Sequence, residues 1–156
     1  MTAPPAVIVQ AGAIPFRPSG RAGWEVLLIR RPHKRKWGIP KGLVERGQTP
    51  RSAARCETLE EAGATGQLSR RPVGAYRLRK PGRRLLVQVY LMRVTGTVDD
   101  YPEREIRERA WFPIERAAAR VSRRTLADLI RTLPRYVRFG PGNRIAFAGD
   151  SRPQPD

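Results

Sequence analysis

Three glutamates stand close together in a chain that has few other acidic residues. Glu57, Glu60 and Glu61 are spaced at i, i+3 and i+4, so that on an α-helix all three project from one face. Three like charges this close repel one another unless a cation lies between them. Because Mg²⁺ and Mn²⁺ prefer carboxylate oxygens, the spacing indicates a divalent metal site. A solvated acidic helix face is the alternative interpretation.

A turn rich in Gly and Pro lies upstream of this segment. Residues 38–42 read Gly-Ile-Pro-Lys-Gly. Such a turn can bring backbone carbonyls and amides near a helix face, where a metal and a phosphate can both use them. Gly and Pro also mark ordinary loops, so the turn adds weight to the acidic cluster but does not identify a site alone.

The chain as a whole is strongly basic. Its 31 Lys and Arg residues outnumber 14 Asp and Glu residues, which gives a net charge of +17. Such a field attracts polyanions, among which nucleic acids, nucleotides, inositol phosphates and polyphosphate all qualify. Compositional drift is the alternative source of the charge, because Arg is far commoner than Lys. We therefore expect a small polyanionic substrate as the partner, with nucleic acid as the second choice.

The basic side chains gather mainly in two stretches of the sequence. Arginine suits phosphate because its planar fork binds two oxygens at once. The candidate substrate-binding residues are Arg30, Arg31, Lys34, Arg35, Lys36, Lys41, Arg79, Lys80, Arg83 and Arg84. His33 could donate a hydrogen bond to phosphate or be a plain loop residue. Trp37 and Tyr76 could stack on a base or belong to the core.

A helix is expected to carry the acidic cluster. Thr49 can cap its first turn, Pro50 fits that turn, and Gly63 stops it. Residues 51–62 between them are good helix formers.

Strands and a second helical region complete the expected fold. Residues 7–16 and 24–29 predict a hairpin, with a turn marked by Pro18, Ser19, Gly20 and Gly23. Further strands are expected near 73–79, 84–94 and 110–112, and helix over 114–133 with a break near 121–122. Residues 37–47 are expected to be irregular. Mixed strands between two helical regions suggest an α/β sandwich in three layers.

Length and composition favour one compact domain. We expect a single domain over residues 1–139 and a partly disordered C-terminal tail over 140–156. No apolar run approaches the roughly 18–20 residues of a membrane span, and no secretory signal is evident. Cys56 is the only cysteine, so an internal disulfide is excluded. A cytoplasmic, reducing setting is therefore expected, and the oligomeric state stays open.

The segment that holds the glutamates resembles a known signature. Residues 42–64 read GLVERGQTPRSAARCETLEEAGA, and the Nudix signature is Gly, five residues, Glu, seven residues, Arg-Glu, an aliphatic residue, any residue, Glu-Glu, any residue, Gly. The positions in register are Gly42, Glu57, Glu60, Glu61 and Gly63. Residues 37–42 are similar to diadenosine polyphosphate hydrolases, while Tyr76, a basic stretch and residues 99–103 and 111–112 resemble diphosphoinositol polyphosphate phosphohydrolases. The resemblance spans about residues 7–133 and implies a Nudix-type α/β/α sandwich with a mixed sheet.

The resemblance implies a hydrolase of acid anhydrides in phosphorus-containing compounds that uses Mg²⁺ or Mn²⁺. The implied metal ligands are Glu57, Glu60, Glu61 and a backbone carbonyl near Lys41 or Gly42. Glu57 is the implied base or ligand of a second metal.

The implied substrate is nucleoside-diphosphate-linked, a dinucleoside polyphosphate or a diphosphoinositol polyphosphate. An extra carboxylate from residues 103–108 is expected to complete the site, with Glu105 as first choice. A catalytically weakened Nudix-fold module that binds RNA or nucleotides is the alternative.

Two departures from the signature matter for the chemistry of the site. Gln48 replaces a Glu and loses one negative charge, and Cys56 replaces the Arg that in the family helps to hold the carboxylates. A thiol supplies neither the charge nor the paired hydrogen bonds of a guanidinium. Arg55 points about 100° away around a helix, so we expect Cys56 to pack beside Leu59. If another residue holds the carboxylates, an arginine of the basic loop 30–36 is the first candidate.

Overall fold

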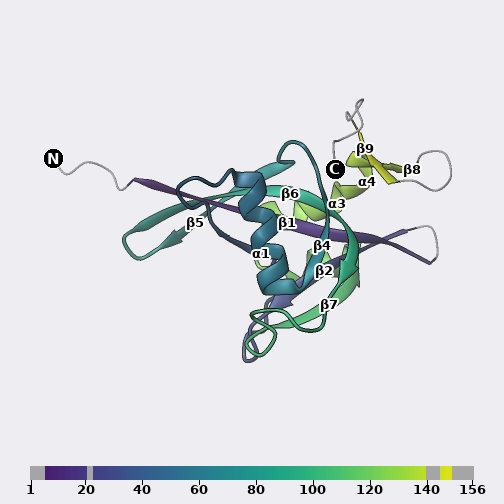
Figure 1. The fold of residues 1–156 in the computed structure, drawn as a ribbon, viewed down its shortest axis with the longest axis horizontal. Coiled ribbons are helices and arrows are strands. Elements are labelled where there is room, and N and C mark those ends of the chain that lie inside the picture. The colour runs from purple at the N-terminus through teal and green to yellow at the C-terminus, as the bar shows by residue number, and fades with distance from the viewer. Residues whose placement is uncertain (1–5, 21–22, 140–144, 149–156) are drawn as a thin grey trace.

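The computed structural model describes residues 6–20, 23–139 and 145–148. Figure 1 shows the arrangement of its strands and helices, with α1 in front of the long strands. The elements are β1 (Val7–Ser19), β2 (Gly23–Arg30), β3 (Lys41–Leu43), α1 (Pro50–Ala62), β4 (Ala64–Leu68), β5 (Gly74–Lys80), β6 (Arg83–Thr97), β7 (Glu108–Pro113), α2 (Ile114–Arg120), α3 (Arg124–Arg131), α4 (Leu133–Tyr136), β8 (Val137–Phe139) and β9 (Ile145–Phe147).

Within the described residues, seven strands form a mixed sheet. Its order is β4-β6-β1-β2-β7, with β3 paired to β1 and β5 paired to β6. The long β1 and β6 run parallel from the Val7–Arg84 pair to the Phe16–Arg93 pair, whereas β1 and β2 form the expected antiparallel hairpin. Residues 37–47 are less irregular than expected, because Lys41–Leu43 pairs with β1 through Gln10, Ala11 and Gly12.

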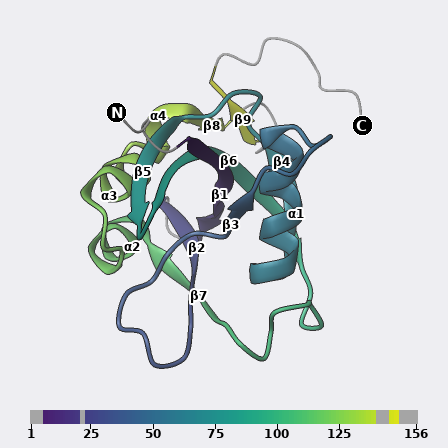
Figure 2. The ribbon, with the colours of Figure 1, turned by 90° about the vertical axis from the view of Figure 1, so that its left-hand side faces the viewer.

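Helices cover both faces of the sheet, as Figure 2 shows with α1 on one side and α2 and α3 on the other. On the α1 side, Ala53 and Ala54 pack against Ala11 and Ala13 of β1. On the other side, Ile14 and Phe16 of the same strand pack with the residues of α2 and α3. The β1 side chains supply both cores because successive residues of a strand point to opposite faces. The expected three-layer α/β/α sandwich is confirmed.

Helix α1 begins and ends where its capping residues predict. The Thr49 hydroxyl accepts a hydrogen bond from the Ser52 N–H at 3.0 Å, and Pro50 occupies the first turn. Gly63 ends the helix with a φ of 62°, in the left-handed region that favours glycine. The helix is also attached at its N-terminal end, where Arg51 donates to the carbonyls of Leu68 and Ser69.

The second helical region is broken as expected and continues further than expected. Val121 lies between α2 and α3 in an extended conformation. Beyond α3, the short α4 leads into β8, which pairs with β9. Part of the expected C-terminal tail is therefore ordered, since Phe147 is buried and contacts Phe16 edge-to-face at 6.1 Å. The rest of that tail, residues 140–144 and 149–156, lies outside the described residues, and the boundary at 139 stays a prediction.

No helix in the described part of the chain is both long enough and apolar enough to cross a membrane.

The junction after α1 predicts a specific stability effect. A Cβ at Gly63 would overlap Tyr101, Arg109 and the Val98 carbonyl, whereas Gly82, with a φ of 68°, has open space around it. We expect Gly63→Ala to lower the free energy of unfolding by about 2–4 kcal/mol, from left-handed strain plus overpacking. The matched Gly82→Ala change should cost only about 1 kcal/mol of strain. Urea unfolding of both variants tests this, and equal losses would contradict the packing role of Gly63.

Candidate active site

The acidic face of α1 lies against β3 and the segment between β6 and β7. Glu57 packs directly on Gly42, so that a Cβ at residue 42 would occupy the space of the Glu57 carboxylate. Gly42 lies in β3, which pairs with β1. The signature glycine is thus needed for the close approach of the helix carboxylate to the strand backbone.

Glu61 is the most firmly held of the three glutamates. Its side chain is nearly buried, Lys41 donates its backbone N–H to Oε2 at 3.0 Å, and Arg107 donates Nη2–H to Oε1 at 3.0 Å. Burial raises the pKa of Glu61 to about 7, and Glu57 and Glu103 add to the rise against the opposing effects of Arg107 and the Lys41 N–H. The protein therefore fixes this carboxylate through backbone and side-chain donors together.

A carboxylate from outside the helix joins the glutamates of α1, as expected. It belongs to Glu103 and not to the expected Glu105. Its backbone N–H donates to the Glu60 carbonyl at 3.0 Å, and its Oε1 accepts from Arg107 Nε at 3.1 Å. Burial raises the pKa of Glu57, with further contributions from Glu60 and Glu103. Glu105, the expected residue, is exposed. The sequence pattern does not reveal which glutamate of this irregular segment contacts α1.

The two departures from the signature have different surroundings from those expected. Cys56 is exposed and Leu59 is 39% exposed, so the expected packing between them is wrong. Gln48 stabilises the loop before α1, where its Oε1 accepts a hydrogen bond from the Glu45 N–H at 3.1 Å. Neither residue contributes a charge to the acidic group.

Arg107 is the functional candidate that the sequence did not indicate. Its guanidinium is mostly buried and bonds Glu61 and Glu103 at once. Of the basic loop, Arg30 pairs with Glu108 at 2.7 Å and lies over the Trp37 ring at 4.4 Å. The carboxylates are therefore anchored by Arg107 and not, as expected, by an arginine of residues 30–36.

Of the expected cations, Lys41 lies beside Glu61, and Lys80 lies close to Lys41. Lys41 donates Nζ–H to Gln10 Oε1 at 3.2 Å. Burial lowers the pKa of Lys41, and nearby Lys80, Arg107 and Arg123 lower it further against the opposing effect of Glu61. A positive cluster therefore adjoins the carboxylates, and Arg123 is a member that the sequence did not indicate.

The other expected binding residues lie in the β2–β3 loop and the β5–β6 hairpin. Figure 2 shows the β2–β3 loop projecting away from α1 before it returns to β3. The exposed cations of this loop are Arg31, Lys34, Arg35 and Lys36. In the β5–β6 hairpin, Arg79 faces Arg84 and Lys80 faces Arg83 across the two strands. His33 is exposed in the loop, and Trp37 and Tyr76 are buried core residues.

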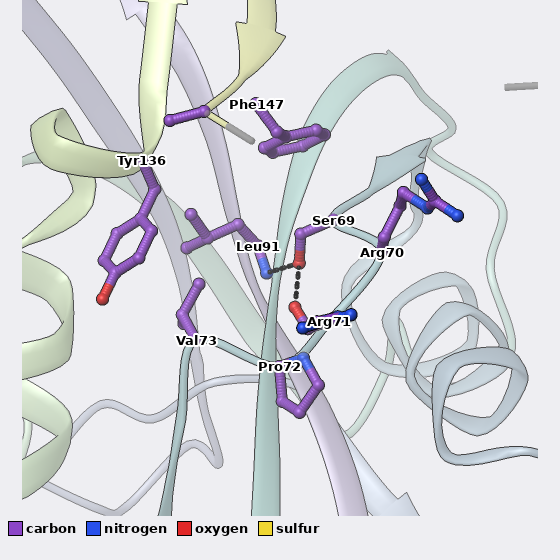
Figure 3. Close-up of a pocket in the computed structure, with 9 residues that line it drawn as sticks. Ser69, Arg70, Arg71, Pro72, Val73, Leu91, Tyr136 and Phe147 are labelled. Atoms are coloured by element: carbon purple, nitrogen blue, oxygen red, sulfur yellow. Dashed lines mark hydrogen bonds between the residues drawn. The ribbon is translucent and has the colours of Figure 1, made fainter. Parts of the chain in front are cut away.

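A cavity of about 640 Å³ lies elsewhere, between the β4–β5 connection and the C-terminal hairpin. Figure 3 shows the Ser69 hydroxyl, which donates to the Arg71 carbonyl and accepts from the Leu91 N–H. The rings of Tyr136 and Phe147 belong to the same lining. As far as the described residues go, its lining holds no carboxylate. We place the chemistry at α1, because the titratable groups with shifted pKa values gather there.

The donor atoms of the acidic group are of the chemical type that a hard divalent cation prefers. Its donors are carboxylate oxygens, and their mutual repulsion leaves negative charge to be balanced. Among the described residues, no three His, Cys, Asp or Glu side chains converge into a ready metal cage. Glu60 is exposed, so its side chain is free of packing constraints that would prevent it from turning towards Glu57.

Several known proteins are similar to this chain in sequence. The mitochondrial Nudix hydrolase 12 of Arabidopsis thaliana is 32% identical over 60% of this chain and 50% of that protein. An 8-oxo-(d)GTP phosphatase of Mycolicibacterium smegmatis is 29% identical over 93% of this chain and 50% of that protein. Diphosphoinositol polyphosphate phosphohydrolase 2 of Rattus norvegicus is 34% identical over 60% and 52%, respectively. The chain spans about half the length of these relatives.

Solved structures and a family model agree with the fold. A Caenorhabditis elegans Ap4A hydrolase in a binary complex superposes with a TM-score of 0.69 over 83% of this chain and 96% of that one, at 24% identity. A Nudix hydrolase from Nitrosomonas europaea gives a TM-score of 0.65 at 19% identity over 83% and 90%. The model of the NUDIX domain matches residues 7–133, most of the chain, and the chain therefore belongs to the Nudix family.

Proposed function

We propose that this chain is a hydrolase that cleaves a phosphoanhydride bond in a polyanionic substrate. The observation that carries the proposal is the acidic group of Glu57, Glu61 and Glu103 beside Lys41, which has Lys80 near it. Carboxylates next to cations suit a reaction in which a metal and a phosphate chain must meet. The relatives support the class, because the named substrates of those from M. smegmatis, rat and C. elegans all contain phosphoanhydrides.

The metal in this proposal is Mg²⁺ or Mn²⁺. Glu57, Glu60 and Glu61 would hold it, together with the backbone carbonyl of Gly42 or Lys41. When bound, such a cation polarises a phosphate oxygen and lowers the pKa of an attacking water.

Glu57 is the residue that we assign to proton removal from water. It rests on Gly42, which limits the positions of its carboxylate and holds it beside the strand backbone. Glu61 is held by Lys41 and Arg107 and keeps a fixed orientation. The attacking oxygen forms a bond to phosphorus, the bridging P–O bond breaks, and the displaced phosphate leaves as an anion.

Substrate capture in this proposal depends on the cations around the acidic group. Lys41 and Lys80 would contact the phosphates, and the exposed cations of the β2–β3 loop and the β5–β6 hairpin would raise the local concentration of polyanions. Like charges that face each other, such as Arg79 and Arg84, destabilise a hairpin in isolation and favour a bound anion.

A cytoplasmic setting agrees with the exposed, single Cys56.

A substrate screen tests the proposed function. Purified protein with Mg²⁺ or Mn²⁺ would be assayed by phosphatase-coupled release of phosphate. The panel would contain nucleoside triphosphates, dinucleoside polyphosphates, nucleotide sugars and diphosphoinositol polyphosphates. We expect metal-dependent turnover of at least one compound. Tight binding of RNA or nucleotides with no turnover of any compound would favour a binding module instead.

Removal of single carboxylates should abolish most of the activity without unfolding the protein. We expect Glu57→Gln, Glu60→Gln and Glu61→Gln each to lower kcat/KM by about 100-fold or more. The matched control is Glu115→Gln, which removes an exposed carboxylate on α2. Circular dichroism would check folding. Full activity in a folded Glu61→Gln variant would show that the acidic group does not hold the metal.

Gly42 and Gly38 form a matched pair for testing the position of Glu57. A Cβ at Gly42 would displace the Glu57 carboxylate, whereas a Cβ at Gly38 meets no atom within 4 Å. A displacement of about 1 Å in a catalytic group can cost about 100-fold in rate. We therefore expect a loss of that order in kcat for Gly42→Ala and near wild-type kcat for Gly38→Ala. Equal activities of the two variants would exclude this role of Gly42.

The raised pKa of Glu61 predicts how stability depends on pH without metal. The folded protein binds the proton of Glu61 more tightly than the unfolded chain, whose carboxyl has the ordinary value of 4.5. The contribution to stability is therefore complete below that value and is lost as pH rises through about 7. Thermal unfolding in EDTA should show a falling Tm over this window, and Glu61→Gln should flatten the profile. Parallel profiles would contradict the shift.

A further inference from the structure

The last turn of α1 is bonded at three points, twice by the segment between β6 and β7 and once by Arg109 at the start of β7. The Glu103 N–H donates to the Glu60 carbonyl at 3.0 Å. Arg107 donates to the Glu61 carboxylate at 3.0 Å. Arg109 donates to the Ala62 carbonyl at 2.9 Å and also reaches the Val98 carbonyl at 2.8 Å. Three consecutive residues at the end of the helix, Glu60 to Ala62, are therefore bonded by the β6–β7 segment and the start of β7.

Arg107 is the contact that joins carboxylates rather than backbone. Its side chain is 17% exposed, and its partners Glu61 and Glu103 are 8% and 25% exposed. Nη2 bonds Glu61 while Nε bonds Glu103, so one guanidinium spans both. Two ionised carboxylates at this depth repel each other, and a planar cation with several donors is suited to holding them together.

We infer that Arg107 is a positioning residue of the active site, which fixes Glu61 and brings Glu103 to the acidic face of α1. The inference rests on the proposed function. Position 56 cannot supply this contact, because Cys56 is an exposed thiol. The interaction therefore comes from 46 residues away in the sequence rather than from the helix itself.

The inference requires that Arg107 assists metal binding, although its positive charge opposes a cation. If the Arg107 guanidinium merely occupied the place of the metal, metal binding would displace it. Removal of the guanidinium would then increase the affinity for the metal. A guanidinium that orients ligands has the opposite effect, because its loss lets Glu61 and Glu103 move apart. The sign of the change in metal affinity separates the two roles.

The main experiment compares Arg107→Ala with wild type in a titration with Mn²⁺, followed by electron paramagnetic resonance of the free ion. We expect Arg107→Ala to weaken Mn²⁺ binding by about 10- to 100-fold, as is usual for the loss of a residue that orients metal ligands. With the substrate found in the screen, kcat should fall more than KM rises. Mn²⁺ bound as tightly as in wild type, or more tightly, would overturn the inference.

Conservative and control variants make the result specific. Arg107→Lys keeps the charge but not the fork, so it should recover only part of the affinity and would serve if Arg107→Ala does not fold. Arg104→Ala removes an exposed arginine of the same segment that pairs with Asp100 at 3.4 Å, and should change Mn²⁺ binding less than twofold. Full recovery by lysine would contradict the need for a bridging fork.

A second test uses the exposed position 56. If Arg107 already holds Glu61, then Cys56→Arg should leave Mn²⁺ affinity within about twofold of wild type, since an exposed pair adds little. A tenfold gain would overturn the inference. Mn²⁺ binding is measured without substrate, so a chain that hydrolyses nothing but loses Mn²⁺ on Arg107→Ala would refute the proposed function and leave this inference standing.

Discussion

The burial of one carboxylate, that of Glu61, governs the arrangement of the site. A carboxylate taken out of water must be bonded or protonated, and both outcomes are evident in its two bonds and its raised pKa. The bond from the Lys41 N–H requires β3 to lie beside α1, and the bond from Arg107 requires the β6–β7 segment to reach the same point. One side chain at the end of a helix thereby determines where two distant segments must lie.

Local chemistry explains why the sequence predicts α1 so well. Its ends depend on Thr49, Pro50 and Gly63, which act within a few residues, and the glutamate spacing needs only the helix itself. β3 was missed because three residues are too few to show an alternation of apolar and polar side chains. They form a strand only because they pair with β1. Arg107 was missed for a related reason: many arginines surround it in the sequence, and only the folded chain distinguishes the one that meets two carboxylates.

The net charge of the chain does not predict which cations contact the site. Arg30 was an expected phosphate ligand, yet it is bonded to Glu108 and stacked on Trp37, so it stabilises β2 against β7. Lys41 differs because it lies beside Glu61. A net charge of +17 acts over the whole surface, whereas a contact depends on which side of the sheet a residue occupies.

Because Arg107 comes from the β6–β7 segment, the arrangement of the site depends on the position of that segment. An arginine on α1 would remain beside the carboxylates whenever the helix is folded. Arg107 instead stays there only while the β6–β7 segment is attached, and its partners Glu103 and Glu61 belong to the two parts being joined. Arg109 strengthens the same attachment by bonding Ala62, Val98 and Asp99 and by lying over the Tyr101 ring at 4.7 Å. The integrity of the acidic group therefore depends on backbone contacts at the end of α1 as much as on the glutamates themselves.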